Sequence, residues 1–315
     1  MSTVRGEPPL LEAPPAVDAH PPTAATAAAL GAAAPGQAGP LHRLGTFARR
    51  RPGLVLAILW LLLLVVAAVL PAAFTSRDPL ATDTAHRLLS PSWSHPFGTD
   101  QLGRDQFARV VHGTSRTLPT ALLATAIGLG TGAALGLLAG FLRGWVDVVV
   151  MRLVDVLLSI PGLLLALTLI AVLGKGGTVQ VAVAIGVAAV AETSRVTRAE
   201  VFRVRESLYV QAAHAGGARR SRVLLRHVLP NAMGPVWALT TLLFGGAVLG
   251  VATLSFLGFG IQPPTPEWGS LVSTGRDHLQ RGWWMSILPG VVVAATVLAA
   301  NRLSREFSDD LGGGR

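Results

Sequence analysis

The chain has 315 residues, of which 51% are hydrophobic and 14% are charged, whereas an ordinary soluble domain has about 25% charged residues; with a mean hydropathy of +0.53, this composition indicates a membrane protein. The formal net charge of +9 does not indicate nucleic acid as a partner, because the arginines lie between apolar runs, where basic loops orient a membrane protein. The complete lack of Cys excludes disulfides, thiolate catalysis, Cys-rich metal sites and a lipidated cysteine anchor.

The N-terminal segment differs in composition from the rest of the chain. Residues 1–42 are rich in Ala and Pro and have few large apolar side chains, so they bury too little surface to offset the entropy of the chain. We therefore expect a disordered cytoplasmic tail. The first strong apolar run begins only at Gly53, which does not fit a cleaved signal peptide.

Six apolar runs follow the tail. A bilayer core of about 30 Å needs about 20 apolar residues of helix, because only closed hydrogen bonding lets the backbone cross lipid. The predicted spans are residues 53–74, 117–142, 156–174, 176–191, 235–258 and 282–301. The fourth is short unless Glu192 and Arg195 extend to the interface. The expected fold class is therefore an all-α integral membrane protein with six transmembrane helices.

Loop charges predict the orientation of these spans. Arginines cluster before the first span, and residues 195–226 contain eight Arg and two Glu, whereas residues 261–281 have no net charge. Basic loops stay on the cytoplasmic side, so we expect both termini in the cytoplasm. The expected organisation is a first span with an extracellular loop over 43–116, a five-helix core over 117–303 with a cytoplasmic loop at 195–230, and a cytoplasmic tail over 304–315.

Two charged or small-residue patterns lie within or beside these spans. Gly128, Gly132, Gly136 and Gly140 recur every four residues, which allows close packing of a helix from this chain or from another chain.

Asp147, Arg152 and Asp155 lie near the start of the third span. A carboxylate at mid-bilayer costs about 2.5–3.5 kcal/mol, so we expect Arg152 to pair with Asp155 on the same helix face. The group is either a cytoplasmic anchor or part of a gate or coupling relay.

Two loops have features of compact structures. Residues 98–105 contain glycines and alternating charges, which predicts a compact loop with internal ion pairs in preference to a substrate contact. The Pro-rich loop 262–266 is stiff, and it serves either as a spacer or as part of a docking surface for another protein.

The basic loop at 195–230 has the most specific pattern. We expect Ser207 to cap a short helix over 208–215, which ends at Gly216 and Gly217. The small side chains of this helix leave one side nearly bare, which favours close approach by a groove of another protein. The alternative is a solvated basic loop that only orients the membrane domain.

The spacing in this loop resembles the E-A-A-x3-G-x9-I-x-L-P signature of ABC-importer permeases, with Gln211 in place of the acidic residue and His227 in place of the apolar one. The resemblance implies a coupling helix that docks into a cleft of an ATP-hydrolysing subunit. The residues implied in coupling are Gln211, Ala212, Ala213, His214, Ala215, Gly216, Gly217, Leu229 and Pro230.

Three further segments, residues 95–105, 146–161 and 262–269, are similar to segments of the dipeptide, oligopeptide and nickel permease family. This resemblance implies a type I ABC-importer permease fold in a bacterial plasma membrane and a pore for di- or oligopeptides, with nickel or another small solute as the alternative cargo. It also implies three kinds of protein partner: a homologous permease, two cytoplasmic ATPase subunits and an extracellular substrate-binding protein.

Sequence motifs for catalysis are absent. The only lysine, Lys175, is followed by Gly176, so the chain has no G-x-x-x-x-G-K-[ST] loop, and we expect ATP and Mg on the partner ATPases and no cofactor here. There is no H-E-x-x-H or G-x-S-x-G motif. Two rivals remain: an ion-coupled secondary transporter, disfavoured because four spans lack ionisable residues, and a membrane scaffold without transport activity.

Overall fold

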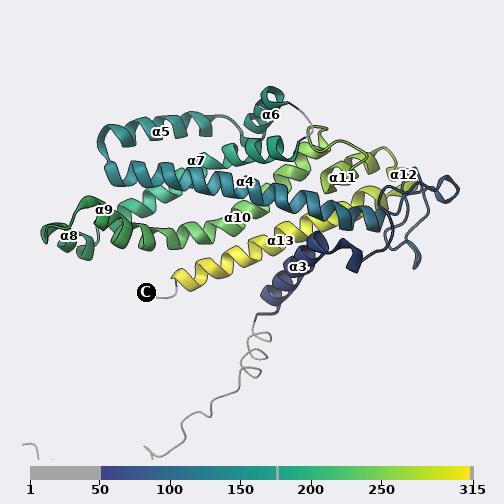
Figure 1. Ribbon diagram of the computed structural model, residues 1–315, viewed down its shortest axis with the longest axis horizontal. Coiled ribbons are helices and arrows are strands. Elements are labelled where there is room, and N and C mark those ends of the chain that lie inside the picture. The colour runs from purple at the N-terminus through teal and green to yellow at the C-terminus, as the bar shows by residue number, and fades with distance from the viewer. Residues whose placement is uncertain (1–50, 175–176, 313–315) are drawn as a thin grey trace, which may run out of the picture. The chain divides into compact units, whose positions relative to one another are not determined.

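The computed structural model describes residues 51–174 and 177–312, with side chains as far as Glu306, so the expected tail over 1–42 lies outside the described residues. Within these ranges the chain is helical, and the single β feature is an isolated bridge between Thr99 and Asp105 (Figure 1). The predicted all-α class is confirmed.

Five described helices are long and apolar enough to cross a membrane, and a bent pair, α5 and α6, makes a sixth if it is one span. This agrees with the six predicted spans. The helices are α3 (Pro52–Val69), α4 (Gln106–Leu142), α5 (Gly144–Ser159), α6 (Gly162–Leu173), α7 (Thr178–Arg205), α8 (Leu208–Ala215), α9 (Arg220–Val223), α10 (Leu229–Phe256), α11 (Trp268–Arg276), α12 (Leu279–Gly282) and α13 (Trp284–Gly312). Short 3-10 turns cover Pro71–Ala73 and Thr84–His86, and a π-helical turn, Leu224–Val228, joins α9 to α10.

The third predicted span is wrong as a single helix. Residues 156–174 are divided between α5 and α6, whose axes meet at 94°. The break lies at Ile160, which is extended (φ −97°, ψ 127°), and Pro161 follows it. A proline disfavours helical backbone at the residue before it and has no N–H to donate.

Other helices are longer than predicted. α4 begins at Gln106, so the extracellular loop, which was predicted to end at residue 116, ends at Asp105. The Asp105 carboxylate accepts a hydrogen bond from the Ala108 backbone N–H at 2.8 Å and caps the helix. α7 continues beyond Glu192 to Arg205, which removes the shortfall of the fourth predicted span. α13 continues helically through much of the predicted tail 304–315.

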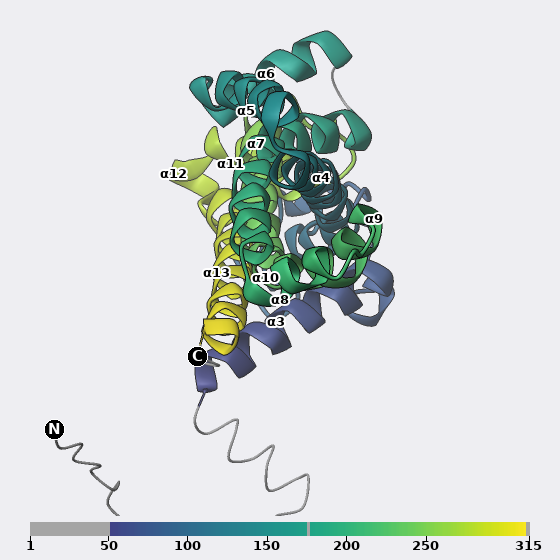
Figure 2. The ribbon, with the colours of Figure 1, turned by 90° about the vertical axis from the view of Figure 1, so that its left-hand side faces the viewer.

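The helices form layers. In both Figure 1 and Figure 2, α5 and α6 lie on one side, α3 lies on the opposite side, and α4, α7, α10 and α13 lie between them. The core takes apolar side chains from α3, α4, α6, α7, α10, α11 and α13, with Ile170, Val248, Leu254 and Trp268 fully buried. Because lipid tails are as apolar as these side chains, close van der Waals packing, and not removal from water, stabilises the contacts between the spans.

The glycine stripe of α4 lies against α7. A methyl group added at Gly128, Gly132, Gly136 or Gly140 would come within 2.4–2.8 Å of atoms of α7. Real Cβ atoms do not approach this closely, so the stripe allows the two backbones to meet. The close neighbour of the stripe is therefore a helix of this chain.

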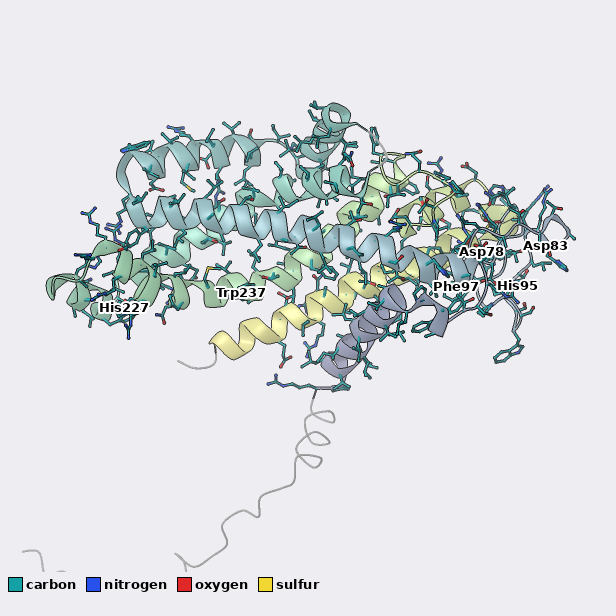
Figure 3. The ribbon with its side chains drawn as sticks, viewed as in Figure 1. Asp78, Asp83, His95, Phe97, His227 and Trp237 are labelled. Atoms are coloured by element: carbon teal, nitrogen blue, oxygen red, sulfur yellow. The ribbon has the colours of Figure 1, made fainter. Side chains whose placement is uncertain are left out.

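The two ends of the bundle differ. α8 and α9 lie at one end, and the loop that precedes α4 lies at the other together with α11 and α12 (Figure 1). Figure 3 shows the same separation, with His227 at one end and Asp78, Asp83 and His95 at the other.

Candidate functional site

The helix α8 follows α7 directly and has the predicted bounds. Gly217 ends its terminal turn with φ +77°, where its N–H donates to the His214 carbonyl at 3.0 Å. A left-handed residue at this place favours glycine. The expected cap by Ser207 is wrong, because its hydroxyl donates back to the Val204 carbonyl at 2.6 Å.

One face of α8 packs against neighbouring turns of this chain, and the opposite face is exposed. Val210 is buried with Val201, Val204, Val223 and other apolar side chains of the neighbouring turns. On the outer face Leu208 is 84% exposed, and Tyr209 and Ala212 are also exposed. Large apolar side chains that are exposed on a helix are typical of a surface that another protein covers.

The predicted coupling residues fall into two groups. Gln211 to Gly217 lie in the second half of α8 and in the turn that ends it, whereas Leu229 and Pro230 lie in the first turn of α10. The Gln211 amide donates to the Glu206 carbonyl at 2.9 Å, and the His214 ring lies 3.2 Å from the Val210 carbonyl. The side chain that replaces the signature's acidic residue therefore contacts the preceding turn.

The acidic residues of α5 pair with α7. Asp147 accepts two hydrogen bonds from Arg198, one of them at 2.7 Å, and Asp155 pairs with Arg195 at 2.8 Å. The expected pairing of Asp155 with Arg152 is therefore wrong, because the arginines of α7 lie alongside α5 and reach its carboxylates. The sequence gives little signal for these pairs, whose members are 51 and 40 residues apart.

The turn between α4 and α5 is tied to the end of α7 that leads into α8. Arg143 pairs with Glu206 at 2.9 Å, and Arg205 donates to the Phe141 carbonyl at 2.6 Å. The guanidinium of Arg143 also lies over the ring of Phe202. Short polar contacts therefore connect the end of α7, which leads into α8, with the α4–α5 turn.

The loop that precedes α4 is compact, as predicted. Asp105 accepts from Arg77 at 2.9 Å and lies 2.8 Å from the His95 ring, and the buried Asp100 pairs with Arg104 at 2.6 Å. These pairs fix the loop against the first turn of α4.

Glu267 fastens α11 to α4. Its buried carboxylate accepts from the backbone N–H groups of Gly269 and Ser270 and from the Thr117 hydroxyl, each at 3.0 Å. The neighbouring Trp268 indole donates to the Val110 carbonyl at 3.0 Å. Burial raises the pKa of the Glu267 carboxyl, and the hydrogen bonds that it accepts act in the opposite direction.

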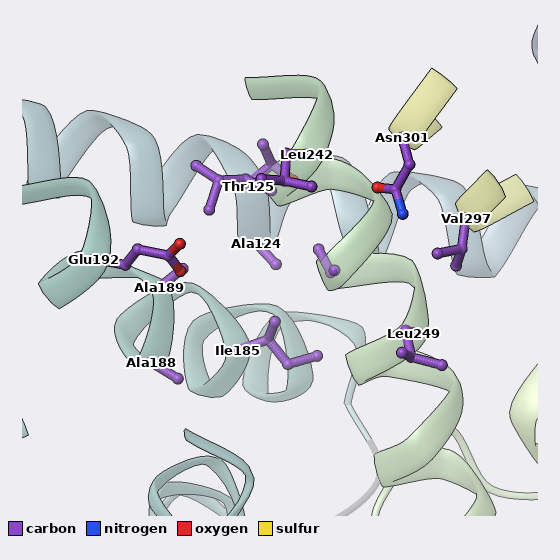
Figure 4. Close-up of a pocket in the computed structure, with 13 residues that line it drawn as sticks. Ala124, Thr125, Ile185, Ala188, Ala189, Glu192, Leu242, Leu249, Val297 and Asn301 are labelled. Atoms are coloured by element: carbon purple, nitrogen blue, oxygen red, sulfur yellow. The ribbon is translucent and has the colours of Figure 1, made fainter. Parts of the chain in front are cut away.

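A cavity of about 410 Å³ lies between α4, α7, α10 and α13 (Figure 4). Its walls are mainly small and branched apolar side chains, and its polar side chains are Thr125 on α4, Glu192 on α7 and Asn301 on α13. A second cavity of about 270 Å³ lies between α6, α7 and α10 and shares Ile185, Ala188, Gly246 and Leu249 with the first. In the described part of the chain, no cluster of three or more His, Asp or Glu side chains forms a metal site.

Comparison with known proteins shows the family in which these features occur. Residues 132–310 match the family model of binding-protein-dependent transport system inner membrane components. The chain is 38% identical to the di/tripeptide transport system permease protein of Pseudomonas aeruginosa, with 81% of this chain and 86% of that protein covered. It is 34% identical to the glutathione transport system permease protein of Escherichia coli O6:K15:H31, with 86% and 90% covered.

A solved structure supports the fold. The inward-facing MetNI methionine ABC transporter has a chain that superposes with a TM-score of 0.52 at 19% identity, covering 63% of this chain and 96% of that one. The helical core is thus that of ABC-importer permeases, and the matched family region contains α8, the α5–α7 ion pairs and most of the cavity lining. The chain belongs to the family of binding-protein-dependent transport system inner membrane components.

Proposed function

We propose that this chain is one of two permease subunits of an ATP-driven importer and that its cargo is di- and oligopeptides. The observation that carries the proposal is α8, a short helix with an exposed apolar face, placed where the family signature lies. The cargo is inferred from relatives that are named as di/tripeptide and dipeptide permeases, at 38% and 36% identity over 81% of this chain. The glutathione permease among the relatives is consistent with a peptide class of substrate.

In this proposal α8 docks into a cleft of a cytoplasmic ATPase subunit. Two such subunits bind ATP and Mg, one beneath this chain and one beneath a homologous permease, so this chain needs no cofactor. Both termini and α8 then lie in the cytoplasm, and the loop before α4 lies outside, where a substrate-binding protein delivers the peptide. The basic composition of residues 195–226 supports this orientation.

The contacts of α7 suggest how the motion of α8 reaches the membrane. ATP-driven closure of the ATPases moves α8, and α8 continues directly from α7. The pairs Arg143–Glu206 and Arg198–Asp147 then transmit the movement to the α4–α5 turn and to α5. The break at Ile160 and Pro161 separates α5 from α6, so α5 can tilt without carrying α6 as a rigid extension. We propose that this motion alternates the pore between its inward-facing and outward-facing forms.

Co-purification tests the proposal. The tagged full-length chain is extracted in mild detergent from its native membrane, and the proteins that remain bound are identified by mass spectrometry. We expect a second six-span permease and one or two P-loop ATPases. Recovery of copies of this chain alone, under conditions that keep a control importer intact, would contradict the proposal and favour an ion-coupled transporter.

A further inference from the structure

The cavity between α4, α7, α10 and α13 contains two polar groups that the fold does not use. Among the residues with described side chains, every carboxylate except that of Glu192 has an ion pair or a hydrogen bond. The amide of Asn301 also has no hydrogen bond within the described part of the chain. Both side chains line the same cavity.

The nearest arginines on α7 do not neutralise Glu192. Arg195 is paired with Asp155, and Arg198 is paired with Asp147, both on α5. Glu192 instead projects into the cavity in Figure 4, with Asn301 at the opposite end and the side chains of Ala124 and Ile185 between them. The carboxylate is therefore exposed and available to a cation that enters the cavity.

The surroundings strengthen such an interaction. A carboxylate within a membrane span is costly, and charged groups at such positions mark substrate or ion pathways. Apolar walls lower the local dielectric, so an opposite charge is attracted more strongly than in water. The volume of about 410 Å³ lies in the range of about 300–1,000 Å³ that is typical of small-ligand sites.

We propose that this cavity is a substrate subsite in which Glu192 binds the protonated amino terminus of the transported peptide and Asn301 hydrogen-bonds a peptide group. The proposal rests on the proposed function, because it takes the cargo to be a peptide. It also places the contact on α7, the helix that continues into α8, so peptide binding and coupling involve the same helix.

The natural lack of cysteine allows a direct test. Ala188 lines the cavity and precedes Glu192 by four residues, so the two side chains lie on one helix face about 5–6 Å apart. The Ala188→Cys chain is assembled with its co-purifying partners in lipid vesicles and labelled with a cationic or an anionic methanethiosulfonate of similar size.

The ratio of the two labelling rates reports the local charge. We expect the cationic reagent to react about tenfold faster than the anionic one, a difference equivalent to about 1.4 kcal/mol. Glu192→Gln should bring the ratio close to one. Glu200→Gln, which removes a carboxylate already paired with Arg203 on the same helix, should leave the ratio unchanged. Equal rates with Glu192 present would show that a group of a partner chain neutralises it and would overturn the proposal.

Protection by peptide tests the ligand. Dialanine should block labelling at a concentration about tenfold lower than N-acetyl-dialanine, which has no ammonium group, as expected for the loss of one charge-assisted hydrogen bond. Glu192→Gln should raise the half-protecting concentration of dialanine about tenfold and leave that of N-acetyl-dialanine unchanged.

ATP-driven uptake of labelled dialanine by the same vesicles separates the two proposals. Uptake without protection, or with equal protection by both peptides, overturns the subsite and leaves the proposed function intact. Vesicles that show neither uptake nor protection overturn both.

Discussion

Replacement of Gly136 by Ala tests the packing of α4 against α7. A methyl group at this position would lie 2.4 Å from the Ser194 carbonyl oxygen and 2.7 Å from the Thr197 Cβ. To restore an ordinary 3.4 Å contact the backbones must separate by about 1 Å, and dispersion contacts along the seam are lost. Overpacking of this kind destabilises a core by about 1–3 kcal/mol.

Gly130→Ala on the same helix is the matched control, since a methyl group there meets no atom within 4 Å. Alanine there favours the helix by up to about 1 kcal/mol. We therefore expect the Tm of purified Gly136→Ala, followed by tryptophan fluorescence in detergent, to lie about 5 °C or more below that of Gly130→Ala. Equal Tm values for the two variants would refute the packing of the stripe against α7.

Three further predictions concern α8, α5 and α11. Gly217→Asp should lower ATP-driven uptake by about tenfold or more, because it places a charge in the docked turn. Gly174→Asp, also at positive φ with nothing within 4 Å but outside the proposed relay, should leave uptake unchanged. Equal uptake by both variants would exclude α8 from coupling. Asp147→Asn should destabilise the chain by about 1 kcal/mol and Asp155→Asn by less than about 0.5 kcal/mol, because the Arg195–Asp155 pair is more exposed than the Arg198–Asp147 pair. A larger loss of thermal stability for Asp155→Asn than for Asp147→Asn would contradict this. Because the pKa of Glu267 is raised in the folded chain, protonation of this carboxyl should stabilise the fold fully below pH 4.5, and this stabilisation should decline as the pH rises from 4.5 towards the raised pKa. Glu267→Gln should therefore flatten this part of the curve of Tm against pH. An unchanged slope in the variant would contradict the raised pKa.

The parts of the fold that follow from local pattern could be predicted from the sequence. The bounds of α8 agree with the prediction because a glycine pair ends the helix, and hydropathy located the long spans. The four-residue glycine repeat predicted close packing, although the sequence left the partner of α4 open. The compact loop before α4 followed from its glycines and alternating charges.

The differences arise where tertiary contacts change the environment of a charge or a proline. Arg109 and Arg116 were expected in a loop, but α4 continues through them, and the buried Arg109 donates to the Pro79 carbonyl at 3.0 Å. Pro161 was visible, yet the apolar run around it suggested one continuous span. Glu192 appeared only as a residue near the end of a short span, and its significance depends on the cavity, which no local sequence pattern encodes.

ATP-dependent uptake of dialanine by vesicles that contain this chain and its co-purified partners tests the central claim most directly. We predict accumulation that requires ATP inside or outside the vesicle, on whichever side the ATPases face, and that persists when proton and sodium gradients are dissipated. Accumulation that follows an ion gradient and ignores ATP would contradict the account.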